Sequence, residues 1–192
     1  MTDDLKTLAR LTDLLPRHTR RREQAARLLV LAFREHWPAA WPDIAAARAE
    51  VDDILAQDSI CRAALDARGH LIGWAGGLCL GYEGRVWELH PLVVDPAHQG
   101  RGVGRALLAD IEARARARGA LTLTLGSDDE HAMTSLSGVD LYDGLWERIR
   151  DIQNRKGHPY TFYQKCGFTI TGVVPDANGP GKPDILMSKR LF

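Results

Sequence analysis

Three glycines, each one residue apart, stand between an apolar stretch and a helical pattern, and this turn constrains the fold more than any other feature. It reads Gln99-Gly100-Arg101-Gly102-Val103-Gly104. A turn of this kind after a strand aims several backbone N–H groups at one point beside a helix N-terminus, where an anion is stabilised. Glycines let the backbone approach a pyrophosphate closely, and Arg101 and Arg105 add charged donors. The turn therefore predicts a phosphate-binding site.

Two common anion-binding motifs do not fit this turn. A nucleotide-binding P-loop ends in Gly-Lys-Ser/Thr, whereas Gly104 is followed by Arg105-Ala106. A dinucleotide fingerprint, Gly-x-Gly-x-x-Gly, follows the first strand of a βαβ unit, and here the spacing differs and several strands come first. A tight strand-to-helix turn that binds nothing is the remaining alternative.

Bulk properties narrow the class of protein. The chain has 192 residues and a formal net charge of zero, with 45% apolar and 26% charged residues, which fits one folded domain over 1–192 without general affinity for nucleic acid. Cys61, Cys79 and Cys166 are too scattered for a disulfide framework or a zinc site. There is no leader pattern and no apolar run of about 18 residues. We expect a cytoplasmic protein with no metal and no membrane contact.

Periodicity predicts a mixed α/β order. Helices are expected at 23–37, from the Asp43 cap to about 57, at 103–118 and at 159–165, with one or two more up to about 155. Strands are expected within 5–15, at 86–95 and at 121–125, with a polar loop at 126–137. Two hairpins are expected, one of 60–67 and 71–82 around the Arg68-Gly69 turn and one of 168–174 and 185–191 around the turn at 178–181. Pro91 cannot donate a ladder hydrogen bond, so its strand should bulge or lose a neighbour there. The basic residues Arg17 and Arg20 to Arg22 suggest a solvated helix end more than a nucleic-acid site.

The pattern Gln99-x-x-Gly102-x-Gly104 after Leu92-Val93-Val94-Asp95-Pro96 resembles the acyl-CoA-binding turn of the GCN5-related N-acetyltransferases. The resemblance implies an α/β fold whose mixed, mostly antiparallel sheet is splayed at a bulged strand and flanked by helices. It also implies acetyl-CoA as co-substrate, with backbone N–H groups of the bulged strand on the pantetheine. The expected cofactor-binding residues are Leu92, Val93, Val94, Gln99, Gly100, Arg101, Gly102, Val103, Gly104, Arg105, Asn154 and Tyr163.

Acetyl transfer to an amine needs a neutral amine, a stabilised oxyanion and a proton for the departing thiolate. The backbone N–H of Leu92 is the candidate oxyanion donor. Tyr163 lies on the short helix that the family folds toward the cofactor sulfur, and the pKa of a phenol, about 10, exceeds that of a thiol, so Tyr163 is the candidate general acid. Glu88 and His90 share one face of their strand. Either residue, or a water, can accept the amine's proton; Glu88 is favoured because a carboxylate also attracts a cationic amine.

A narrower resemblance covers most of the chain beyond about Phe33. The segments Trp87 to Val94, Gly126 to Asp129, Asp140 to Tyr142, His158 to Tyr163, Asn178-Gly179 and Lys182 to Ile185 are similar to the aminoglycoside 6′-N-acetyltransferases of the small dimeric subgroup. This implies direct transfer from acetyl-CoA to a polycationic aminoglycoside, drug resistance and a homodimer. The expected substrate contacts are Trp37, Tyr82, Glu88, Asp128 and Asp129.

The acceptor leaves alternatives open. A polyamine, an amino sugar or a protein N-terminus would need the same transfer chemistry. The loop carboxylates Asp128 to Glu130 can instead be a solvated loop cap. A non-catalytic acetyl-CoA sensor is a third possibility, although such a sensor would need neither Glu88 nor Tyr163.

Overall fold

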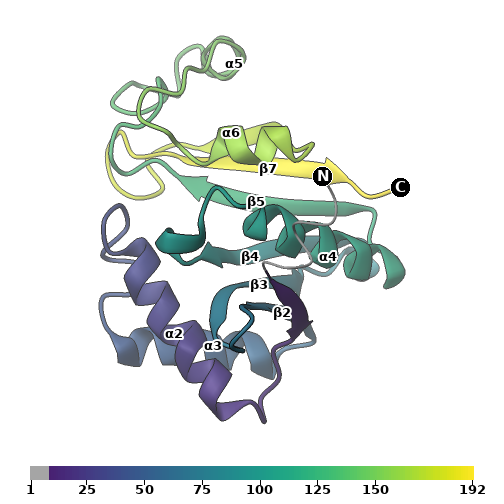
Figure 1. The fold of residues 1–192 in the computed structure, drawn as a ribbon. Helices are drawn as coiled ribbons and strands as arrows, with labels where there is room; N and C mark the ends of the chain where they lie inside the picture. The colour runs from purple at the N-terminus through teal and green to yellow at the C-terminus, as the bar shows by residue number, and fades with distance from the viewer. Residues whose placement is uncertain (1–8) are drawn as a thin grey trace. The chain divides into compact units, whose positions relative to one another are not determined.

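A computed structural model describes residues 9–192 (Figure 1). These residues group into two compact units. The first unit runs to Leu123 and includes Leu191–Phe192, and the second is Thr124–Arg190. A single domain over 1–192 stays a prediction. Within the described part of the chain, no helix is long and apolar enough to cross a membrane.

Four antiparallel strands form the sheet of the first unit, in the order in which they follow along the chain. They are β1 (Arg10–Asp13), β2 (Ser59–Leu65), β3 (Leu71–Cys79) and β4 (Val86–Val94), with the short helical turns η1 (Tyr82–Gly84) and η2 (Pro96–His98) on either side of β4. The predicted β2–β3 hairpin is confirmed. The strand expected to reach residue 82 ends at Cys79, because Gly81 and η1 turn the chain away.

Three helices belong to the first unit: α2 (Thr19–Phe33), α3 (Ile44–Ala56) and α4 (Val103–Ala117). As predicted, Asp43 caps α3 by accepting a hydrogen bond from the Ala46 N–H. The predicted bounds of α2 were wrong by four residues at each end. Its first turn contains Arg20 to Arg22, and Arg22 pairs with Asp52 of α3.

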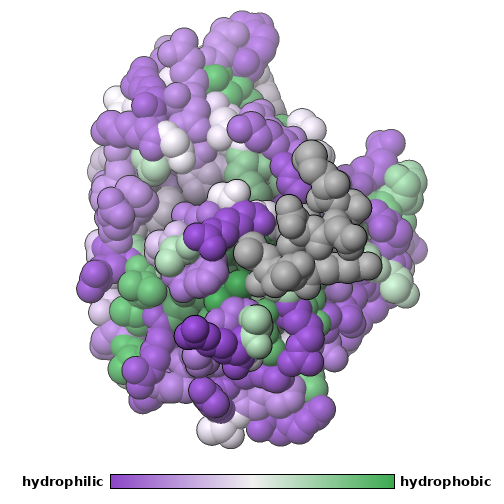
Figure 2. All heavy atoms as spheres, viewed as in Figure 1, coloured by the Kyte–Doolittle hydropathy of each residue, from purple (hydrophilic) through white to green (hydrophobic). Residues whose placement is uncertain are grey.

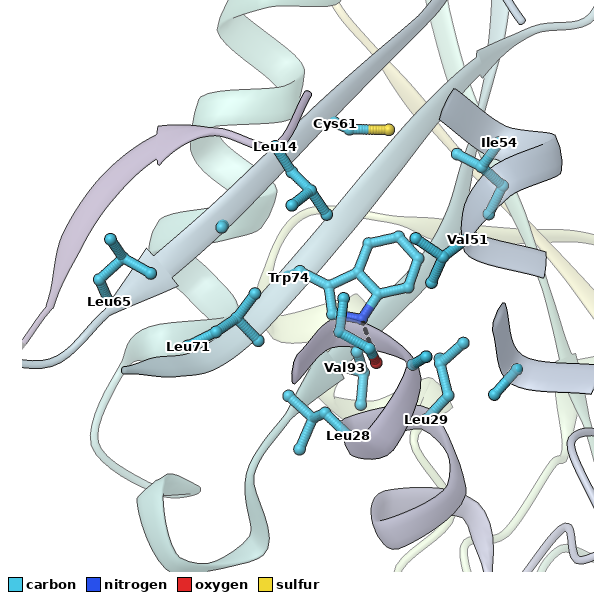
Figure 3. Packing of buried hydrophobic residues seen from close by; sticks show 14 residues of the cluster. Leu14, Leu28, Leu29, Val51, Ile54, Cys61, Leu65, Leu71, Trp74 and Val93 are labelled. Carbon is cyan, nitrogen blue, oxygen red and sulfur yellow. Dashed lines mark hydrogen bonds between the residues drawn. The ribbon is translucent and has the colours of Figure 1, made fainter. Parts of the chain in front are cut away.

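The core of the first unit lies where α2 and α3 pack against the sheet (Figure 3). Trp74 of β3 is fully buried, and its indole N–H donates to the carbonyl of Ala25 at 3.2 Å. The neighbouring Gly73 points to the opposite face, since side chains alternate along a strand. A Cβ on Gly73 would lie 3.2 Å from Leu107 of α4. Glycine therefore lets α4 approach that face closely.

The second unit contains most of β5 (Thr122–Asp128), from Thr124 on, followed in the sheet by β7 (Asp184–Arg190) and β6 (Thr169–Val174). The predicted β6–β7 hairpin is confirmed. Two short helices, α5 (Leu145–Arg150) and α6 (Tyr160–Lys165), lie in the long connection between β5 and β6. Strand β5 continues to Asp128, so the loop predicted for 126–137 begins three residues later than expected.

Hydrophilic residues dominate the face drawn in Figure 2, with hydrophobic residues in small groups among them. Four large aromatic side chains are strongly exposed in the described residues: Tyr82, Tyr142, Trp146 and Phe192. The first three lie in turns or short helices, and none of the four lies in a strand. Rings in such positions are available for contact with a ligand.

Candidate active site

Strand β4 has a β-bulge at Pro91, as predicted. Leu92 pairs with Ala75 and Leu89 pairs with Gly77, so two residues of β4, His90 and Pro91, stand opposite the single residue between their partners on β3. That residue is Gly76, and a Cβ there would lie 2.2 Å from the carbonyl oxygen of His90. The bulge therefore requires glycine on the neighbouring strand. The His90–Pro91 peptide bond is cis, a feature that the sequence did not reveal.

Burial alternates along β4. Trp87, Leu89, Pro91 and Val93 are buried, whereas the residues between them are half-buried: Glu88, His90, Leu92 and Val94. Glu88 and His90 thus share one face of the strand. Two of the three candidate catalytic groups of the first unit, the side chains of Glu88 and His90, therefore lie on this face at the bulge. The third is the backbone N–H of Leu92.

His90 has a partner that sequence reasoning missed. Its Nε2 lies 3.1 Å from Oε1 of Glu50, on α3. The other oxygen of Glu50 accepts a hydrogen bond from the Trp41 indole at 3.4 Å. Because of the His90 contact, the pKa of Glu50 lies below its usual range. Nothing in the helical pattern around Glu50 signals this contact, since the two residues are 40 positions apart.

Trp37 and Trp41 belong to an aromatic group at the end of α2. Their rings lie 5.8 and 4.6 Å from the ring of Phe33, the Trp41 ring edge-on. The Trp41 ring is also 6.2 Å from that of His90. Trp37 was expected at a substrate site and Trp41 was not, although the structure brings Trp41 to His90.

Tyr82 is presented by an unusual turn. Tyr82 and Glu83 have φ angles of 50° and 56°, and Gly84 follows at 78°. Side chains rarely adopt this left-handed region. Tyr82 is 74% exposed. The turn thus holds the predicted substrate-contacting ring out in solvent.

The glycine turn has the geometry of an anion site. Gly100 and Gly102 have φ angles of 71° and 86°, and Gly102 is the N-cap of α4. No side chain caps this N-terminus, so its first N–H groups point outward with the positive end of the helix dipole. Arg101 and Arg105 are exposed beside it. The side chain of Gln99, expected at the cofactor, donates to the Val94 carbonyl and so ties the turn to β4.

Asp129, in the second unit, differs from its expected role. The side chain is fully buried, and its oxygens accept hydrogen bonds from the N–H groups of Met133 and Thr134 and from the Thr134 hydroxyl, at 2.7 to 2.8 Å. A carboxylate so engaged holds its loop together rather than meeting a substrate. The neighbouring Asp128 carboxylate is half-buried and accepts a hydrogen bond from Asn178. No group of three His, Cys, Asp or Glu side chains within residues 9–192 is placed to hold a metal ion.

Asp129→Asn is expected to lower the free energy of unfolding by about 2 kcal/mol, because the amide nitrogen would face N–H donors without an acceptor. Urea denaturation measures the loss. Asp143→Asn, an exposed aspartate on the same connection, is the control and should be neutral. Equal stability of both variants would contradict the anchoring role.

Asn154 was expected at the cofactor, and the structure places its amide at the start of α6. Its Oδ1 accepts from the His158 N–H, and its Nδ2 donates to the His158 carbonyl and to the Thr161 hydroxyl, at 2.8, 2.8 and 3.2 Å. Helix α6 carries Tyr163, whose ring lies 5.2 and 5.8 Å from those of Phe162 and Phe168. Burial raises the pKa of Tyr163, so the phenol stays protonated at neutral pH.

The contacts of His158 at the start of α6 make the stability of the protein depend on pH. Its Nδ1 accepts from the Tyr160 N–H and its Nε2 lies 3.1 Å from the Asp128 carbonyl, an arrangement that suits only the neutral ring. Burial lowers the pKa of His158 below its usual value. This contribution to stability is therefore complete above about pH 6.5, the unfolded value, and is lost as the pH falls below it.

We expect the unfolding free energy to drop between about pH 7 and about pH 5.5 by up to 1.4 kcal/mol per pH unit for this group. His158→Gln should flatten that dependence, as measured by urea denaturation at several pH values. If the unfolding free energy of the variant fell equally steeply with pH, the pH dependence would come from other titratable groups.

Comparison with known proteins adds three findings. The model of the acetyltransferase (GNAT) family matches residues 22–136. The crystal structure of an aminoglycoside 6′-N-acetyltransferase complexed with coenzyme A is 34% identical with a TM-score of 0.86, covering 95% of this chain and 97% of that one. The aminoglycoside 6′-N-acetyltransferase from Enterococcus faecium is also 34% identical, with a TM-score of 0.84 and the same coverage.

A match of another kind is the N-alpha-acetyltransferase RimI of Mycobacterium tuberculosis. It is 41% identical over 72 residues, which are 37% of this chain and 45% of that protein. The chain spans less than half the length of the curated relatives that it matches.

Proposed function

Because the chain belongs to the acetyltransferase (GNAT) family, we propose that it transfers the acetyl group of acetyl-CoA to the 6′-amine of an aminoglycoside. The observation that carries the proposal is the bulge of β4, with Glu88 and His90 on the half-buried face before it and Leu92 after it. The near full-length similarity to two aminoglycoside 6′-N-acetyltransferases supports the choice of acceptor.

The first unit offers a place for each part of the cofactor. The uncapped N-terminus of α4, with Arg101 and Arg105 beside it, suits the pyrophosphate. The backbone from Leu92 to Val94 is the proposed site for the pantetheine. Gly100 and Gly102 suit the pyrophosphate site because glycine adopts the left-handed backbone found there and has no side chain to cover the N–H groups.

Four groups of this chain divide the chemistry. Bound acetyl-CoA supplies an activated acetyl group. Glu88 attracts the ammonium form of the acceptor and takes its proton, directly or through water, which leaves a neutral nucleophile; His90 is a second acceptor for that proton. The Leu92 N–H stabilises the negative charge that develops on the carbonyl oxygen as the new C–N bond forms. In the second unit, Tyr163 is the acid that returns a proton to sulfur as the C–S bond breaks.

The acceptor contacts follow from its chemistry. An aminoglycoside is a polycationic sugar, so carboxylates and aromatic rings suit it. Glu88 and Asp128 are the proposed carboxylates, and Trp37 and Tyr82 the proposed rings that pack on sugar faces. Cytoplasmic location, a homodimer and a role in drug resistance complete the proposal.

A thiol-release assay with purified protein and acetyl-CoA tests the proposal. Turnover is expected with aminoglycosides that carry a 6′-amine and not with matched drugs that carry a 6′-hydroxyl. Bacteria that express the gene should grow at higher concentrations of the first group only. Bound acetyl-CoA without turnover of any aminoglycoside would reject this acceptor, and the absence of turnover with every amine and peptide tested would reject the enzyme in favour of a sensor.

A protein N-terminus is a second candidate acceptor, which the 41% identity to RimI over 72 residues favours. The same assay with short peptides distinguishes the two. Faster turnover of a peptide than of any aminoglycoside would replace the proposed acceptor, while Glu88, Leu92 and Tyr163 would keep their roles.

A further inference from the structure

Glu50 makes a directed contact with His90. Its Oε1 lies 3.1 Å from the ring Nε2, and the carboxylate side chain is 29% exposed, so the contact is partly shielded from water. An ionised carboxylate has no proton to donate. The hydrogen on this bond must therefore come from His90, and a neutral His90 in this contact carries its hydrogen on Nε2.

The rest of the surroundings hold Glu50 in place. The Trp41 indole donates to its second oxygen at 3.4 Å, and Phe33 packs edge-on against Trp41 with ring centres 4.6 Å apart. The carboxylate is thus fixed at both oxygens. The low pKa of Glu50, caused first by the His90 contact, keeps it ionised at neutral pH.

We infer that Glu50 is a positioning residue that fixes the ring orientation and the tautomer of His90, the second proposed acceptor of the amine's proton. Glu50 does not touch the reacting atoms; it acts through His90. The catalytic consequence rests on the proposed acetyl transfer, whereas the tautomer is a property of the free protein.

The first test is spectroscopic and needs no turnover. Nitrogen-15 NMR of the histidine rings, with His90 assigned by its loss in His90→Gln, reports which nitrogen carries the hydrogen. We expect the Nε2–H tautomer in the wild type. Glu50→Gln should give a mixture, because an amide can donate as well as accept. An unchanged His90 signal in Glu50→Gln would overturn the inference.

The matched control is Asp53→Asn, which removes the same charge from an exposed position on the same helix. It should leave the His90 signal unchanged. A shift of the same kind in Asp53→Asn would show that His90 responds to the charge of α3 in general, and this would also overturn the inference.

The second test is a double-mutant cycle in acetyl transfer. Glu50→Gln should lower kcat by about tenfold or more with an unchanged KM for acetyl-CoA, and it should cause no further loss in a His90→Gln background. Full additivity of the two losses would overturn the inference. If no aminoglycoside is turned over, the proposed function fails, and the NMR measurement still decides the role of Glu50.

Discussion

Gly76→Ala is expected to lower the free energy of unfolding by about 3 kcal/mol or more, the largest effect on stability that we predict. The new methyl group would lie 2.2 Å from the carbonyl oxygen of His90, a backbone atom that cannot move without displacing the bulge. Urea denaturation measures the loss, and turnover should fall with it because Glu88 and Leu92 flank the same bulge.

The control for this variant is Gly172→Ala in strand β6. A Cβ there would have only the Leu186 side chain near it, at 3.8 Å, which is ordinary contact. This variant should stay within about 0.5 kcal/mol of the wild type. Wild-type stability and turnover in Gly76→Ala would mean that the bulge does not need this glycine.

Tyr163→Phe is expected to lower kcat by a factor of about 100 or more, with acetyl-CoA binding unchanged. The variant keeps the ring that packs beside Phe162 and Phe168 and removes only the proton that the thiolate needs. Steady-state kinetics with a 6′-amino aminoglycoside and a binding titration with acetyl-CoA check the two parts.

Tyr160→Phe is the matched control, one turn earlier on α6. Tyr160 is buried, and its backbone N–H, which a phenylalanine keeps, donates to Nδ1 of His158, so the phenylalanine variant should keep its turnover. Full activity of Tyr163→Phe would remove Tyr163 from the mechanism. Loss of activity in both variants alike would indicate packing of α6 rather than acid catalysis.

Local chemistry made much of the fold predictable. Because proline lacks an N–H, Pro91 predicted the bulge in β4. The glycine turn predicted the start of α4 to within one residue. Both hairpins followed from their turn residues. The α/β fold of the N-acetyltransferase family is confirmed by the family match and by the solved structures. The predicted roles of the site residues stay predictions.

The missed features depend on contacts between distant residues. In the sequence, Glu50 looks like an ordinary surface carboxylate and Asp129 like a substrate contact. The folded chain places Glu50 against His90 and buries Asp129 in its loop. The start of α2 was misplaced for a similar reason, because its first turn is held by Asp52 of another helix. The periodicity of a sequence predicts which face of a helix or strand a residue occupies, but it does not predict which distant residue that side chain will contact.

Under the proposed function, the left-handed turn at Tyr82 and Glu83 limits how acceptor choice can evolve. Glycine, asparagine and aspartate tolerate such backbone angles, whereas valine, isoleucine and threonine resist them. Many substitutions at these two positions would therefore destabilise the turn. New acceptor preferences should arise first at residues in ordinary backbone conformations, such as Trp37 or Asp128, with the turn inherited nearly unchanged.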